Sequence, residues 1–130
     1  MRGVIRAFAA LVMTLLFIIA ARADGDAARG EAKFQDCAAC HKLLAGINEV
    51  GPSLNGIFGR SAGELASFRY SPAIKRSGIT WTPETLEAYL ADPQKIVPGN
   101  RMPYAGLTDA EARADLIAYL KSALKQATGK

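Results

Sequence analysis

The chain has 130 residues, of which 50% are hydrophobic, and its formal net charge at pH 7 is +4. This length fits one small domain. Three of the 16 basic residues precede position 24 whereas none of the 12 acidic residues does, so residues 24–130 carry 13 basic against 12 acidic residues, a net charge of +1. The overall basic charge therefore gives no support for nucleic-acid binding.

Residues 1–23 have the pattern of a secretory signal peptide. Two arginines precede an apolar run, which ends in the small-x-small sequence Ala21-Arg22-Ala23. The run is shorter than the about 20 residues that a membrane-spanning helix usually needs. We therefore expect cleavage after Ala23, which leaves residues 24–130 as the mature domain. An uncleaved N-terminal anchor is the alternative.

The next predicted element is a short helix from Asp26 to Asp36, because small and apolar residues alternate there with polar ones and acidic residues at its start favour the helix dipole. It leads into Cys37-Ala38-Ala39-Cys40-His41, which holds both cysteines and the only histidine of the chain. This spacing is typical of c-type haem attachment. Each thiol can add to one vinyl group of the porphyrin, and the histidine is then held under the ring within reach of the iron.

Other uses of the Cys37–Cys40 pair fit the sequence less well. A thioredoxin-like dithiol needs a strand before it and a βαβ pattern around it. A structural zinc site needs four ligands, and no second Cys/His pair exists. A disulfide is possible in an exported protein but leaves His41 without a role. The sequence thus predicts one covalently bound haem c, held through Cys37 and Cys40.

Loops are expected over residues 43–70, because five glycines and a proline interrupt this stretch. A short helix follows, with Ser71 as its N-cap, Pro72 at its first position and Gly78 after its end. No strand pattern of convincing length appears anywhere. The predicted class is therefore all-α with long loops.

Three helical segments complete the chain. One opens at Thr82 and stops before Pro93, and Asp92-Pro93 starts another turn or two that end near Pro98. The last helix follows the capping box Thr108-Asp109-Ala110-Glu111 and carries apolar residues at helical spacing as far as Leu124.

The candidates for axial ligands of the iron are few. His41 is the only imidazole, and Met102 is the only methionine after position 23. Met102 lies in a polar, turn-rich stretch, residues 98–103, where a methionine that merely fills a gap in the core would be out of place. His/Met ligation is the pairing of electron-transfer cytochromes. We therefore predict His41 and Met102 as axial ligands, which leaves no open position for oxygen or peroxide.

With these features in order, the chain resembles class I cytochromes c, close to the bacterial cytochrome c2 and mitochondrial-like group. The resemblance runs from about Gly30 to Leu120. It implies an all-α cytochrome c fold, with four or five helices and long loops wrapped around one covalently attached haem. The matching segments are the Cys37–His41 motif and residues 51–60, 78–81, 84–90, 98–102 and 115–120.

The resemblance also implies roles for side chains around the haem. Pro52 would accept a hydrogen bond from the free ring nitrogen of His41, which fixes the tautomer of the ligand. Tyr89 and Asn100 would lie on the Met102 side and tune it by hydrogen bonding. The residues expected around a buried propionate are Arg60, Tyr70 and Trp81. Those expected where the first and last helices cross are Gly30, Phe34, Leu116 and Tyr119.

The function that the resemblance implies is a soluble periplasmic electron carrier, monomeric and not an enzyme. It would carry one electron at a time between redox proteins such as a membrane cytochrome complex, an oxidase, a reaction centre or a dehydrogenase. A second reading is a membrane-anchored carrier or the haem subunit of a specific dehydrogenase or oxidase system. A third is a haem enzyme or gas sensor in which Met102 is dissociated.

One departure from the family concerns docking. Relatives with a strongly basic ring around the haem edge have lysines at several positions that are acidic or neutral in this chain. Such charges mainly set the rate of encounter with a partner. We therefore expect no strongly basic docking patch. The departing residues are Asp36, Gln94, Thr108 and Asp109, whereas Lys42, Lys95 and Arg101 remain near the expected face.

Overall fold

The computed structural model describes residues 24–128, so the predicted signal peptide lies outside the described residues. Within them the chain forms five helices and no strand, which confirms the predicted all-α class. Two isolated bridges join His41 to Asn48 and Ser61 to Thr80. No helix in the described part is long and apolar enough to cross a membrane. The helices are α2 (Ala27–Ala38), α3 (Pro72–Arg76), α4 (Pro83–Ala91), α5 (Pro93–Ile96) and α6 (Ala110–Thr128).

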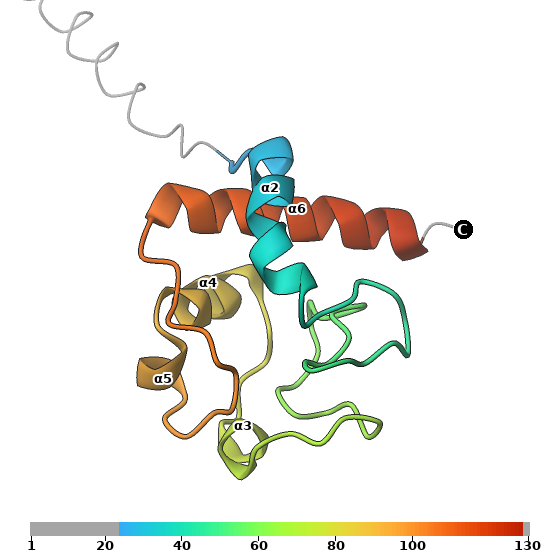
Figure 1. Cartoon of the computed structure of the whole chain (residues 1–130), viewed down its shortest axis with the longest axis vertical. Coiled ribbons are helices and arrows are strands. Elements are labelled where there is room, and N and C mark those ends of the chain that lie inside the picture. Colours follow the sequence, from blue (N-terminus) through green and yellow to red (C-terminus); the bar gives the residue numbers. More distant parts are fainter. Residues whose placement is uncertain (1–23, 129–130) are drawn as a thin grey trace, which may run out of the picture.

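The helices and loops surround a central space. Figure 1 shows α2 crossing α6 at one end of the molecule and α3 at the opposite end. Helices α4 and α5 lie on one side, and the long loops between α2 and α3 lie on the other. Buried apolar residues from the loops and from every helix except α5 line the space between them: Phe34, Ile57, Ile74, Trp81, Leu86, Tyr89, Leu90, Leu116 and Leu120.

Short polar side chains fix where most helices begin. The Asp26 side chain accepts from the Arg29 N–H at α2, the Ser71 side chain from the Ile74 N–H at α3, and that of Asp92 from the Lys95 N–H at α5. These starts agree with the predicted ones. At α4 the side chains of Thr82 and Thr85 each accept from the other residue's N–H, a reciprocal cap that the sequence analysis missed.

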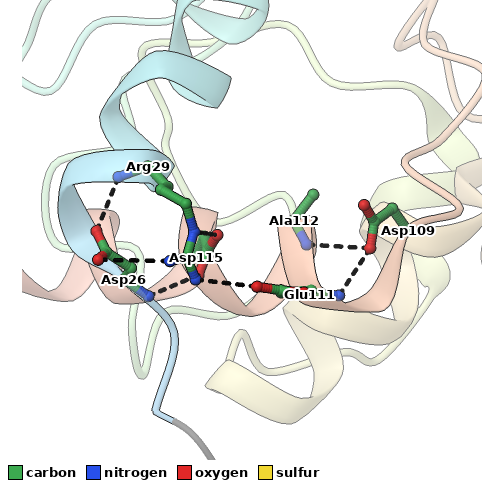
Figure 2. A network of polar contacts seen from close by, with 6 residues as sticks. All are labelled: Asp26, Arg29, Asp109, Glu111, Ala112 and Asp115. Atoms are coloured by element: carbon green, nitrogen blue, oxygen red, sulfur yellow. Dashed lines mark hydrogen bonds and ion pairs between the residues drawn. The ribbon is translucent and has the colours of Figure 1, made fainter.

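The predicted capping box of the last helix is wrong. Helix α6 begins at Ala110, and the Asp109 carboxylate, not the Thr108 hydroxyl, accepts from the N–H groups of Glu111 and Ala112, at 2.9 and 3.3 Å. Figure 2 shows that the Glu111 side chain points instead towards Arg29 on α2. A carboxylate at this position also interacts favourably with the positive end of the helix dipole. Asp109 is therefore a better N-cap here than the uncharged hydroxyl of Thr108.

Helices α2 and α6 meet where a glycine allows it. A Cβ on buried Gly30 would overlap the backbone carbonyl of Asp115 and lie 2.8 Å from the Cβ of Tyr119. One turn further on, the rings of Phe34 and Tyr119 pack with centroids 5.4 Å apart, and Leu116 is 2% exposed. The expected crossing of the first and last helices is therefore present, with backbones in direct contact.

A buried carboxylate reinforces this crossing. Asp115 is 3% exposed and accepts from the backbone N–H of Asp26 at 2.6 Å and from the Nε and Nη2 of Arg29 at 2.7 and 2.9 Å. The Arg29 Nη2 also lies 3.1 Å from Glu111 (Figure 2). One carboxylate on α6 thus holds both the N-cap and the first turn of α2.

This network predicts an acid-sensitive fold. The hydrogen bond from Arg29, and after it the Asp26 N–H, lower the pKa of Asp115 below its ordinary value of 3.8. The unfolded chain therefore takes up this proton at a higher pH than the folded chain. The stability that ionised Asp115 contributes is fully present above the unfolded pKa and is lost as pH falls through the folded one.

We expect the free energy of unfolding to decrease with falling pH below about 4, and to decrease less steeply in Asp115→Asn. Urea unfolding at a series of acidic pH values measures both. Glu31→Gln is the control, because Glu31 is an exposed carboxylate on α2. Identical pH dependences in the wild type and Asp115→Asn would contradict the prediction.

Candidate haem site

The central space is a cavity of about 330 Å³, within the range of small-molecule and cofactor sites. It brings together residues that lie up to 86 positions apart in the chain, from Phe34 to Leu120. Nine of the ten site residues proposed from the sequence line it: Cys37, Cys40, His41, Pro52, Arg60, Tyr70, Trp81, Tyr89 and Met102. The tenth, Asn100, is buried in the loop behind Met102.

The two cysteines lie at the end of α2, which extends two residues further than predicted and includes Cys37. The Cys37 carbonyl accepts from the N–H groups of Cys40 and His41, at 3.0 and 2.9 Å, and so fixes the turn of the motif. Both cysteines line the cavity and form no disulfide. Burial, and after it nearby Asp36, raise the pKa of Cys37, which keeps the thiol protonated.

The His41 ring is held at one nitrogen. Its Nδ1 lies 2.8 Å from the Pro52 carbonyl, which can only accept, so Nδ1 carries the proton and Nε2 keeps its lone pair. Burial lowers the pKa of His41, and the Pro52 contact offsets only part of this effect. A Cβ on Gly51 would overlap the ring, so the glycine makes room for it. The result is a neutral imidazole prepared to bind a metal.

The Met102 loop is organised by Asn100. The Asn100 Nδ2 donates to the carbonyls of Pro93 and Val97, both at 2.9 Å, and its Oδ1 accepts from the Met102 N–H, also at 2.9 Å. The side chain is 6% exposed. It therefore ties Met102 to α5 through the backbone, which differs from the expected hydrogen bonding that tunes the ligand itself. Met102 is half-buried against the cavity.

Two aromatic pairs form part of the cavity wall. The rings of Trp81 and Tyr89 meet edge-on with centroids 5.0 Å apart, and burial raises the pKa of Tyr89 to about 12. Tyr70 packs edge-on against Phe68 at 4.9 Å. Burial raises the pKa of Tyr70 as well, although the charge of Arg60 acts against this. Both tyrosines stay neutral at ordinary pH and can donate hydrogen bonds into the cavity.

Arg60 leaves one buried donor unused. Its Nη1 donates to the Asn55 carbonyl at 3.0 Å and its Nη2 to the Ser53 carbonyl at 2.9 Å, whereas its Nε is buried and has no partner among the described residues. A buried donor without an acceptor is costly, by about 1–3 kcal/mol. A carboxylate in the cavity would satisfy it. The residues present therefore fit a haem: apolar walls, two thiols, an imidazole lone pair, a thioether and a cationic donor for a propionate.

The sequence analysis missed some parts of the site. Phe68 and Tyr104 also line the cavity, and Asn48 makes three side-chain contacts near His41. No motif marks these residues. Lys42 was expected near the docking face. Its Nζ donates to the Ala38 carbonyl at 3.1 Å and forms an ion pair with Glu49 at 3.4 Å.

Comparison with known proteins agrees with this fold. Residues 27–124 match the cytochrome c family model, described as cytochrome c. The chain belongs to the cytochrome c family, as the resemblance implied. It has the cytochrome c fold, carries one covalently attached haem c, and transfers electrons rather than acting as an enzyme.

Within the family, this chain is similar to cytochromes c2. It is 48% identical over 111 residues to cytochrome c2 from Blastochloris viridis, which covers 82% of this chain and 87% of the relative. It is 53% identical over 89 residues to cytochrome c2 iso-2 from Magnetospirillum fulvum, covering 68% and 93%. Among solved structures, cytochrome cH from Methylobacterium extorquens matches with a TM-score of 0.71 and 46% identity, covering 75% and 99%.

Proposed function

We propose that this protein is a periplasmic carrier of single electrons, with His41 and Met102 as the axial ligands of the haem iron and Cys37 and Cys40 as its thioether attachments. The observation that carries the proposal is the state of the His41 ring. Because Nδ1 is hydrogen-bonded to the Pro52 carbonyl, the lone pair of Nε2 is free to bind iron. His41 lines the same cavity as Met102 and both cysteines. The bound haem supplies the Fe(III)/Fe(II) couple.

The chain's own residues suit this task. The His41 ring is held by the Pro52 carbonyl, and the backbone N–H of Met102 donates to the Asn100 side chain, so hydrogen bonds restrain the His41 ring and the loop that carries Met102. A thioether ligand favours Fe(II) and raises the reduction potential. With His41 and Met102 both bound to the iron, oxygen and peroxide would find no binding site.

Further roles follow for the other residues of the cavity. Arg60 would donate to a propionate of the bound haem through its Nε, which has no partner among the described residues, and Tyr70 and Trp81 would complete the surroundings of that group. Tyr89 stays protonated, because its pKa is raised to about 12, and faces the same cavity as Met102 as a neutral donor. Asn100 holds the loop that carries Met102.

Export to the periplasm is proposed from the first residues of the sequence. Residues 1–23 have the signal-peptide pattern, and the apolar run is short for an anchor. N-terminal sequencing of the exported protein separates the two readings. A start at Asp24 supports a cleaved carrier, whereas retained residues 1–23 support an anchored one.

The proposed partners are redox proteins such as a membrane cytochrome complex, an oxidase, a reaction centre or a dehydrogenase, which a monomer meets transiently. The loop after His41 exposes three apolar side chains, Leu44, Ile47 and Val50, at 65%, 45% and 71%, and Val50 also lines the cavity. Lys42 in the same loop is engaged by Glu49. These features favour docking through apolar contacts over docking through a strongly basic ring.

A spectrum tests the ligand assignment. We expect the oxidised protein to show a far-red sulfur-to-iron charge-transfer band, because only a bound thioether produces it, and the reduced protein to bind carbon monoxide poorly. Absorbance spectroscopy of the purified holoprotein measures both. Absence of the band, or rapid binding of carbon monoxide, would show that Met102 is not bound and would favour an open haem site.

A further inference from the structure

One peptide group lies between His41 and Asn48. The carbonyl of the Pro52–Ser53 peptide lies 2.8 Å from the Nδ1 of His41, and the N–H of the same peptide donates to the Oδ1 of Asn48 at 2.9 Å. The three groups form a continuous chain of hydrogen bonds from the Asn48 amide through one peptide to the imidazole.

The orientation of the Asn48 amide is fixed by its second contact. Its Nδ2 donates to the carbonyl of Ser67 at 3.1 Å and lies 3.0 Å from the Ser67 Oγ. The Ser67 carbonyl can only accept and the Ser53 N–H can only donate. The amide oxygen must therefore face Ser53, and exchanging the oxygen and nitrogen of Asn48 would break both contacts.

The peptide itself is held firmly in place. Ser53 is 2% exposed, its Oγ donates to the Leu44 carbonyl at 2.6 Å, and its carbonyl accepts from the Nη2 of Arg60 at 2.9 Å. The isolated bridge between His41 and Asn48 brings the two ends of the chain of hydrogen bonds together. A change at Asn48 therefore acts on the electronic state of this peptide more than on its position.

From this geometry we infer that Asn48 is a positioning residue that lowers the reduction potential of the haem through the Pro52–Ser53 peptide. Linked hydrogen bonds polarise one another. An acceptor at the N–H end makes the Pro52 carbonyl more negative, which strengthens its hydrogen bond from His41. The imidazole then donates more electron density through Nε2 and stabilises Fe(III). The inference rests on the proposed role of His41 as an axial ligand.

Two substitutions separate this effect from a simple link between loops. Asn48→Ala removes the acceptor for Ser53 and the donor for Ser67. Asn48→Asp keeps an acceptor for Ser53, removes the donor and adds a negative charge, so it is compared through the His41 resonance and the Ser53 exchange rate and not through the potential. If Asn48 merely links the loops, the two variants behave alike. If it polarises the peptide, Asn48→Asp preserves the state of His41 and Asn48→Ala does not.

The measurements are proton NMR of the reduced holoprotein, amide exchange and potentiometry. In Asn48→Ala we expect the Nδ1 proton resonance of His41 to move upfield, the Ser53 amide to exchange up to about tenfold faster, and the potential to rise. The rise corresponds to about a twofold change in the equilibrium with a reference couple, or about 18 mV at 59 mV per tenfold. In Asn48→Asp, whose carboxylate is a stronger acceptor, we expect neither the upfield movement of the resonance nor the faster exchange of the Ser53 amide.

Asn55→Ala is the matched control. It removes a similar contact in the same loop, from the Asn55 Nδ2 to the Leu43 carbonyl at 3.1 Å, without touching the Pro52–Ser53 peptide. We expect lower stability and an unchanged potential. If Asn48→Ala leaves the His41 resonance and the potential unchanged, or if Asn48→Asp moves the resonance as Asn48→Ala does, the inference is wrong. A wild-type protein without the far-red band would instead refute the proposed ligation.

Discussion

Replacing Met102 by histidine is expected to remove the far-red band and to lower the reduction potential by on the order of 0.2 V, a part of the about 0.8 V range that axial ligands span. The soft thioether favours Fe(II), whereas an imidazole donates more strongly and favours Fe(III). The loop can present the new side chain, because Asn100 holds the backbone of residue 102 and not its side chain. Potentiometry and absorbance spectra measure the effect.

Two further variants make this test specific. Met102→Leu leaves the sixth position of the iron without a protein ligand, so we expect rapid carbon monoxide binding by the reduced protein. Arg101→Gln is the control, since Arg101 is exposed and adjacent, and its substitution should keep the band. A far-red band that persists in Met102→His would show that this sulfur is not the ligand, since no other methionine follows position 23.

The second large effect is expected at the helix crossing. Gly30→Val should destabilise the fold by about 3 kcal/mol or more, because the added side chain would overlap the Asp115 carbonyl and press against Tyr119. Backbone atoms cannot move aside as the end of a side chain can, so the helices must separate. Separation also pulls Arg29 from Asp115 and loosens the end of α2 that bears Cys37. Urea unfolding of the holoprotein measures the change.

Gly46→Ala is the matched control for this prediction. Gly46 has a φ of +73° and no atom within 4 Å of an added Cβ, so its substitution tests backbone strain alone. We expect a cost of about 1 kcal/mol there. Equal effects of the two substitutions would mean that close approach of α2 and α6 does not govern stability.

Local signals in the sequence predicted most of the helices correctly. The side chains of Asp26, Ser71 and Asp92 each accept a hydrogen bond from the backbone N–H three residues further along the chain. Such local capping can be predicted without knowing the tertiary structure. The last cap was assigned wrongly because Thr108 and Asp109 are neighbouring candidates. The Glu111 side chain, which the predicted box required, is engaged by Arg29 on another helix, and this contact is not visible in the local sequence.

The site was predictable to the extent that its chemistry is rare in the sequence. A single histidine and a single methionine after position 23 left no competing choice for His41 and Met102. Asn48 could not be found this way, because its contacts join Ser53 and Ser67 across two loops of irregular backbone. Asparagine is common in loops for many reasons, so the residue type alone carries no information about such a role.

The contact between Asp26 and Asp115 spans 89 positions of the chain. Closing a loop of this length costs entropy, and that cost is offset only when both ends have met. Cys37 is in the helix that this closure anchors. The crossing therefore joins the segment that attaches the cofactor to the far end of the chain, and the wall that α6 contributes to the cavity depends on a contact between residues distant in the sequence.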